Sequence, residues 1–156
     1  MTHTRRINLI MWAGAILLGV VFAYAAWPKI ADPSLFGQSI HRYALLPNSG
    51  VSLLAIYLPW LEIGAAIFVL WPRYRAAAAT LIAAMLVAFL VAQGSALARG
   101  LDISCGCFSG SGAEDKIGWH SLLRNACLLL IALILACRGH ANARNHATEA
   151  PSGTDT

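Results

Sequence analysis

Long apolar runs alternate with short polar segments along this chain, and four of the runs are long enough to cross a bilayer. A membrane-spanning helix needs about 20 apolar residues. The runs are rich in Ala, Leu, Ile and Val, and none shows the period-two alternation of a barrel strand, so the pattern favours helices whose backbone groups are all bonded within the segment. The expected spans are residues 7–27, 51–71, 76–98 and 117–137.

The composition supports a membrane protein. Of the 156 residues, 58% are hydrophobic and 12% are charged, whereas soluble domains carry about 25% charged residues. The mean hydropathy is +0.65. We therefore expect an all-α fold, a four-helix transmembrane bundle over residues 1–140, followed by a disordered cytoplasmic tail at 141–156. The net charge of +4 comes mostly from residues beside the apolar runs, which indicates contact with membrane lipid and not with nucleic acid.

The first run also has features of a signal peptide. Arg5 and Arg6 precede it, and Ala23-Tyr24-Ala25 has the small–x–small pattern of a cleavage site. Its apolar stretch, however, exceeds the roughly 7–15 residues of a signal core. We therefore favour a retained helix, and we expect Pro28 to end it.

Basic residues predict the orientation in the membrane. Three basic groups fall on one side of the predicted layout, which the positive-inside rule makes cytoplasmic together with both termini. On the other side, Lys29 and a few further basic residues are diluted by acidic ones. That side would face the periplasm of a bacterial inner membrane, where disulfides persist. The three groups are Arg5 with Arg6, Arg73 with Arg75, and Arg138 with Arg144.

A short interfacial helix is expected between the first two spans, at residues 33–44. Asp32 followed by Pro33 is typical of an N-cap and a first helical position, and apolar residues recur on one face. A loop with scattered apolar residues is the alternative. Further along, the segment from Trp71 to Arg75 is long enough only for a tight turn, so the second and third spans should be antiparallel neighbours.

Candidate redox chemistry lies between the third and fourth spans, where Cys105 and Cys107 flank Gly106. A disulfide between these cysteines closes a small strained ring, which glycine tolerates, and strained exposed disulfides are oxidising and labile. Closing so short a loop removes little chain entropy, so the bond suits exchange better than stabilisation. An inert pair is the alternative. We expect no metal site, because His41 and His120 show no convergent spacing with the cysteines.

The two remaining cysteines, Cys127 and Cys137, lie ten positions apart in the fourth span. That separation is about 15 Å along a helix axis, so they cannot pair with each other. Cysteine is common in buried apolar surroundings, and we expect both to be packing residues.

Glu62 lies near the middle of the second span, three residues after Pro59. An ionisable side chain at this depth costs about 2.5–3.5 kcal/mol on insertion scales, so we expect it to have a charged partner or a functional role. Arg124, beside Asn125, enters the fourth span from the same side and is the expected partner. The pair either locks the bundle or makes Glu62 a proton acceptor or part of a quinone pocket, with Pro59 freeing a backbone carbonyl nearby.

These residues resemble the MauE family of methylamine-utilisation membrane proteins, which are grouped with DoxX-like proteins. The specific part of the resemblance is Cys-Gly-Cys-Phe between the third and fourth helices. The family pattern continues with glycine, whereas Ser109 stands here before Gly110, which changes the loop and leaves the thiols in place. The matching segments are residues 29–33 through Phe36, 43–47, 59–62, 99–101, 105–108 and 124–125.

The resemblance implies a redox-associated protein whose relatives are linked to disulfide formation and to maturation of periplasmic methylamine dehydrogenase, beside a thioredoxin-like partner. Cys105 and Cys107 would be its exchanging pair. We expect a thiol–disulfide oxidoreductase that exchanges electrons with a periplasmic thioredoxin-like protein and with either a membrane quinone or a second redox carrier. The alternatives are a non-catalytic assembly or scaffold protein and a small-solute carrier with a midplane site at Glu62 and Arg124.

Overall fold

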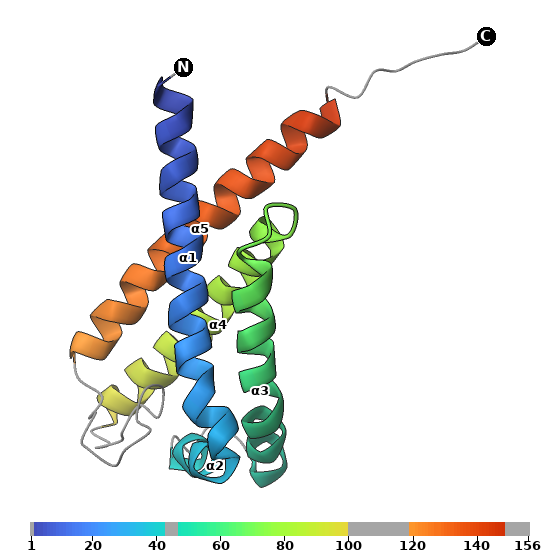
Figure 1. Ribbon diagram of the computed structural model, residues 1–156. Helices are drawn as coiled ribbons and strands as arrows, with labels where there is room; N and C mark the ends of the chain where they lie inside the picture. The colour runs from blue at the N-terminus through green and yellow to red at the C-terminus, as the bar shows by residue number, and fades with distance from the viewer. Residues whose placement is uncertain (1, 43–46, 100–118, 149–156) are drawn as a thin grey trace.

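The computed structural model describes residues 2–42, 47–99 and 119–148, and the described residues form helices and no strand (Figure 1). Four helices are long and apolar enough to cross a membrane, which confirms the predicted all-α, four-helix membrane architecture. The helices are α1 (Thr2–Ala31), α2 (Pro33–Arg42), α3 (Asn48–Phe68), α4 (Arg75–Ala98) and α5 (Trp119–Thr148).

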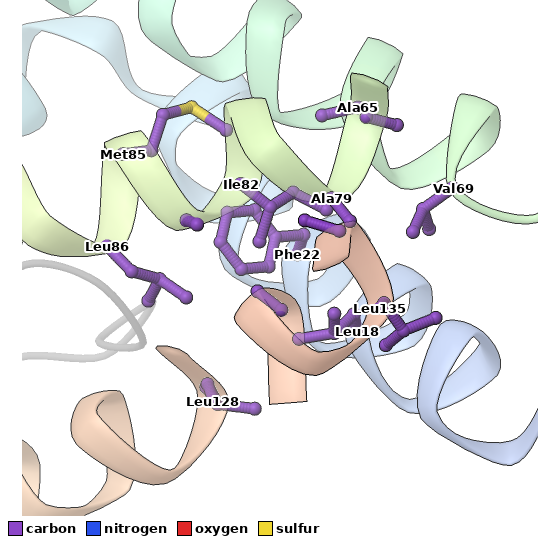
Figure 2. Packing of buried hydrophobic residues seen from close by; sticks show 14 of the residues in the cluster. Leu18, Phe22, Ala65, Val69, Ala79, Ile82, Met85, Leu86, Leu128 and Leu135 are labelled. Atoms are coloured by element: carbon purple, nitrogen blue, oxygen red, sulfur yellow. The ribbon is translucent and has the colours of Figure 1, made fainter. Parts of the chain in front are cut away.

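The four long helices form two pairs, and α2 lies across one end of the bundle (Figure 1). Packing is most extensive between α4 and α5 and between α1 and α3. Small residues allow α1 and α3 to pack closely, since a Cβ added at Gly19 of α1 would lie 3.1 Å from the carbonyl oxygen of Ala66 in α3. A cluster of buried apolar side chains from all four helices, including Phe22 and Ile82, fills the space between the pairs (Figure 2).

The helix boundaries match most of the predicted spans. The turn before Arg75 is tight, and α3 and α4 are antiparallel neighbours as predicted. The short helix α2 begins at Pro33 as expected and ends at Arg42, while the last two residues predicted for it lie outside the described residues. The sequence pattern therefore locates each helix, but most helix ends differ from the predicted bounds, and the largest difference is at the end of α5.

Pro28 does not end the first helix, contrary to the prediction. It lies inside α1, which continues to Ala31, and the backbone N–H of Asp32 donates to the Pro28 carbonyl at 3.1 Å. A proline removes one hydrogen bond from the preceding turn but leaves its own carbonyl able to accept the next one. The extra turn keeps Lys29 on the helix.

The C-terminal segment also differs from the prediction. Residues 141–148 were expected to be disordered, but α5 continues through them to Thr148. Gly139 does not interrupt the helix, because there α5 packs against the first turn of α4. A Cβ added at Gly139 would lie 2.6 Å from the Ala76 Cβ, so the absence of a side chain permits this contact. The rest of the predicted tail, 149–156, lies outside the described residues.

The ends that carry the basic groups lie toward one side of the bundle. The start of α1, the α3–α4 turn and the end of α5 point in the same direction (Figure 1). Arg75 joins three segments there: its guanidinium carbon lies 4.4 Å from the centre of the Trp12 ring in α1, and its Nε donates to the Val69 carbonyl at 3.3 Å. The predicted grouping of basic segments is therefore present in the structure.

Asp32 caps the start of α2, as predicted. Its Oδ1 accepts from the Ser34 hydroxyl at 2.7 Å and from the backbone N–H groups of Ser34 and Leu35 at 3.1 Å each. The Ser34 hydroxyl, followed by the Leu35 and Ser34 N–H groups, lowers the pKa of Asp32 below its ordinary value. The ionised carboxylate therefore holds the N-terminus of α2 in place.

We expect the Asp32 cap to weaken under acid conditions. Because its pKa is lower in the folded protein, the carboxylate stabilises α2 fully above its unfolded pKa of about 3.9, and this stabilisation is lost as pH falls through the lower folded value. Asp32→Ala should raise hydrogen exchange at the Ser34 and Leu35 amides several-fold at neutral pH. Asp32→Asn is the matched control, since it keeps a capping oxygen; equal exchange in all three proteins would contradict the cap.

Gly139→Ala should destabilise the bundle by about 1–3 kcal/mol, the usual cost of overpacking a close contact. The added Cβ would force α5 away from Ala76. Gly94→Ala is the matched control, because a Cβ there meets nothing within 4 Å. Reversible unfolding in a bilayer-mimetic detergent measures both variants; equal stability of the two would contradict the close α4–α5 contact.

Candidate functional site

A buried ion pair joins α1 to α3 inside the bundle. The Lys29 Nζ donates to both carboxylate oxygens of Glu62, at 2.5 and 2.8 Å. The two residues are 2% and 1% exposed, so bulk water does not screen the pair. The interaction is therefore both charge-assisted and shielded, the conditions under which an ion pair is strongest and the loss of one partner is most costly.

Helix direction explains why these two side chains meet. Side chains on a helix lean toward its N-terminus. Lys29 lies in the last turn of α1 and therefore leans back into the bundle. Glu62 lies on the antiparallel helix α3 and leans toward the end where α1 finishes (Figure 1). The long lysine side chain spans the remaining distance and carries its charge inward.

A second buried polar pair joins α4 to α5. The Asn125 Nδ2 donates to the Gln93 Oε1 at 3.0 Å, and both residues are buried. Among the residues whose side chains the structure describes, each of the four spanning helices thus contributes one polar side chain to these two buried pairs. We call these four residues the polar layer: Lys29, Glu62, Gln93 and Asn125.

A small cavity and two aromatic rings surround the ion pair. The cavity has a volume of about 30 Å³ and is lined by Lys29, Glu62, Asn125 and apolar side chains. The Lys29 Nζ also lies 5.0 Å from the centre of the Phe36 ring of α2 and 5.1 Å from that of the Phe89 ring of α4. Ring faces attract cations, so these contacts add to the stabilisation of the buried ammonium group.

The expected partner of Glu62 was wrong. Arg124 was predicted to pair with it, but Lys29 holds both of its carboxylate oxygens. Lys29 had been counted among the basic residues outside the membrane, yet it is buried. The extension of α1 past Pro28 is the physical reason, because it directs Lys29 into the bundle.

Pro59 and Asn125 both lie near Glu62, as predicted. Pro59 is buried inside α3, nearly one turn before Glu62, and has no N–H to donate to the Ala55 carbonyl. Asn125 lines the same cavity as Glu62. The structure therefore brings Glu62 and Asn125 together as expected, with Lys29 in the position expected for Arg124. Lys29 and Gln93 were missed as site residues, although Gln93 is a polar residue well inside an apolar run.

The cysteines fall into two groups. Cys105 and Cys107, the predicted exchanging pair, lie outside the described residues. Cys127 and Cys137 are free thiols exposed on the outer surface of α5, so the expectation that they pack within the bundle was wrong. Among the described residues, no group of three or more His, Cys, Asp or Glu side chains is placed to hold a metal.

We expect Lys29→Met to lower the free energy of unfolding by about 3–5 kcal/mol, because it leaves the Glu62 charge buried without a counter-ion. The double variant Lys29→Met/Glu62→Met should recover most of that loss, since both charges are then absent. Reversible unfolding in detergent measures the coupling between the two positions.

The matched control for this cycle is Arg124→Met combined with Glu62→Met. Its coupling should be clearly smaller than that of the Lys29–Glu62 cycle. Additive effects of Lys29→Met and Glu62→Met, or equal coupling in the two cycles, would contradict the assigned pair.

Comparisons with known proteins identify relatives of this chain. A family model described as methylamine utilisation protein MauE matches residues 7–138. The chain is 35% identical over 123 residues to the MauE protein of Methylophilus methylotrophus, covering 78% of this chain and 65% of that protein. It is 30% identical over 129 residues to the MauE protein of Paracoccus denitrificans, covering 82% and 69%.

A third relative, the MauE protein of Methylorubrum extorquens, is 36% identical over 118 residues, which cover 75% of this chain and 63% of that protein. The matched part of the chain thus spans about two thirds of the length of these relatives. No solved structure matches the chain. Because the family model covers most of its residues, the chain belongs to the MauE family.

Proposed function

We propose that this chain is a membrane thiol–disulfide exchange protein of methylamine utilisation, with Cys105 and Cys107 as its exchanging pair and a periplasmic thioredoxin-like protein as its partner. The observation that carries the proposal is the Cys-Gly-Cys-Phe motif at 105–108, inside the part of the chain that the MauE model matches. The names of the relatives supply the link to methylamine utilisation.

The position of the motif in the fold supports this role. The chain leaves α4 at Ala98 and enters α5 at Trp119 on the end of the bundle where α2 lies, away from the basic groups (Figure 1). By the positive-inside rule, that end faces outward. A bacterial inner membrane would then present both thiols to the periplasm, where a soluble partner reaches them and disulfides persist.

Exchange follows the chemistry of thiols. A thiolate of the reduced partner attacks one sulfur of a Cys105–Cys107 disulfide, forms a mixed disulfide and releases the other cysteine as a thiolate, which takes up a proton. The second partner thiol then attacks the mixed disulfide, which oxidises the partner and releases the remaining cysteine. Two electrons and two protons have moved to this chain, and the same steps run in reverse when the partner is the oxidant.

A second acceptor must take up those electrons for turnover, either a membrane quinone or another redox carrier. The cavity beside Glu62 has a volume of about 30 Å³, which is room for about one water and not for a quinone ring. The predicted quinone pocket at Glu62 is therefore not favoured, and a quinone would have to bind elsewhere on the protein.

The same geometry bears on the alternatives. In a small-solute carrier, Glu62 would face a space large enough for the solute, whereas its carboxylate oxygens are held by Lys29 beside a water-sized cavity. A scaffold protein with incidental cysteines is the remaining alternative, and cysteine replacement separates it from thiol exchange.

Cys105→Ser and Cys107→Ser should each abolish exchange with the partner, and one of the two should accumulate a mixed disulfide with a thioredoxin-like protein. The mixed disulfide forms because the resolving thiol has been removed. Alkylation of intact cells followed by non-reducing gels and mass spectrometry detects it. Cys127→Ser and Cys137→Ser are the matched controls and should keep wild-type exchange. A pair that stays permanently reduced, or full function of the Cys105→Ser/Cys107→Ser double variant, would overturn the proposal.

A further inference from the structure

The polar layer links helices within the two pairs of the bundle. Lys29 and Glu62 join α1 to α3, and Gln93 and Asn125 join α4 to α5. These are the helix pairs that pack most extensively against each other. The two polar contacts therefore hold each helix pair together, and across the pairs the Lys29 ammonium of α1 also lies over the Phe89 ring of α4.

The cavity lies between the two helix pairs. Its lining comes from both sides: Lys29 and Glu62 from α1 and α3, and Asn125 with Phe89 from α5 and α4. Its volume of about 30 Å³ exceeds the roughly 10–15 Å³ that a water molecule needs. A buried water also needs two to four polar partners, and the lining supplies three polar side chains.

We propose that this cavity is a binding site for one ordered water molecule, which hydrogen-bonds to the Lys29–Glu62 pair and to Asn125. The water would join the two polar contacts into one network that ties α1 and α3 to α4 and α5. This site is independent of the thiol exchange proposed above and would exist whether or not Cys105 and Cys107 are redox-active.

The hydrogen-bonding capacity of the lining groups favours water over a dry cavity. A lysine ammonium has three protons, and two of them serve the Glu62 oxygens. Each carboxylate oxygen has a further lone pair, and the Asn125 amide has a carbonyl oxygen and a second proton besides the one given to Gln93. The rings of Phe36 and Phe89 attract the cation but do not replace a full hydrogen bond. A water molecule within reach of these groups would make hydrogen bonds that the apolar side chains lining the cavity cannot make.

Selective labelling tests the site directly. The sequence holds two lysines, Lys29 and Lys116, so Lys116→Arg leaves Lys29 as the single ¹⁵Nζ-labelled side chain. Solid-state NMR of this protein in lipid bilayers should show dipolar transfer between water protons and the Lys29 ammonium. Measurement at two pH values separates this transfer from proton exchange, which varies with pH. Absence of transfer to Lys29 would overturn the proposal.

A cavity-filling variant tests whether the water occupies this space. Ala25 lines the cavity on α1, and Ala25→Val adds two methyl groups without changing any polar side chain. It should abolish the transfer and lower the thermal midpoint, because the polar layer loses its water. If the cavity is dry, the added methyl groups would fill it favourably and the thermal midpoint would rise. Unchanged transfer, or a raised midpoint, would contradict the proposal.

Two further variants complete the test. Ala13→Val makes the same change on the same helix, but in an apolar groove between α1 and α5, and should leave both the transfer and the midpoint unchanged. Leu86→Phe enlarges a side chain on the α4 wall of the cavity and provides a second way to fill it if Ala25→Val does not fold. It should also abolish the transfer, and retained transfer in Leu86→Phe would count against this location.

Discussion

The buried contact between Lys29 and Glu62 is the constraint on which the arrangement of this protein depends. Two charges inside an apolar bundle are tolerated only together, so α1 and α3 are held at one relative position along their axes. The aromatic rings of Phe36 and Phe89 add contacts from α2 and α4 to the same ammonium group. One side chain in the last turn of α1 therefore touches three other helices.

The opposite end of the bundle is organised around a different cation. Arg75 contacts Trp12 and the Val69 carbonyl, and so ties the α3–α4 turn to α1. The helices also pack closely where small residues meet, at Gly19 against Ala66 and at Gly139 against Ala76. Because lipid offers little hydrophobic drive for helix association, polar contacts and close backbone approach are the expected means of packing in a membrane bundle.

Much of the fold was predictable because membrane insertion leaves a strong pattern in the sequence. The four spans, the turn before Arg75 and the cap at Asp32 follow from apolar run length and local turn chemistry. The partner of Glu62 did not follow from these signals, since Lys29 and Arg124 are both basic residues near the same end of the predicted bundle. The choice depends on whether α1 continues past Pro28, which is set by packing and hydrogen bonding of the last turn. Tertiary packing likewise carries α5 past Gly139, where composition indicated disorder.

Helix α4 ends and α5 begins at the end of the bundle where α2 lies, and the arrangement of the helices there depends on the Lys29–Glu62 contact. The most direct test is a charge exchange, Lys29→Glu with Glu62→Lys, compared with each single variant by reversible unfolding in detergent. Each single variant should be severely destabilised by two like charges in the core, and the double variant should regain a large part of the lost stability. A double variant no more stable than the worse single variant would contradict the Lys29–Glu62 contact.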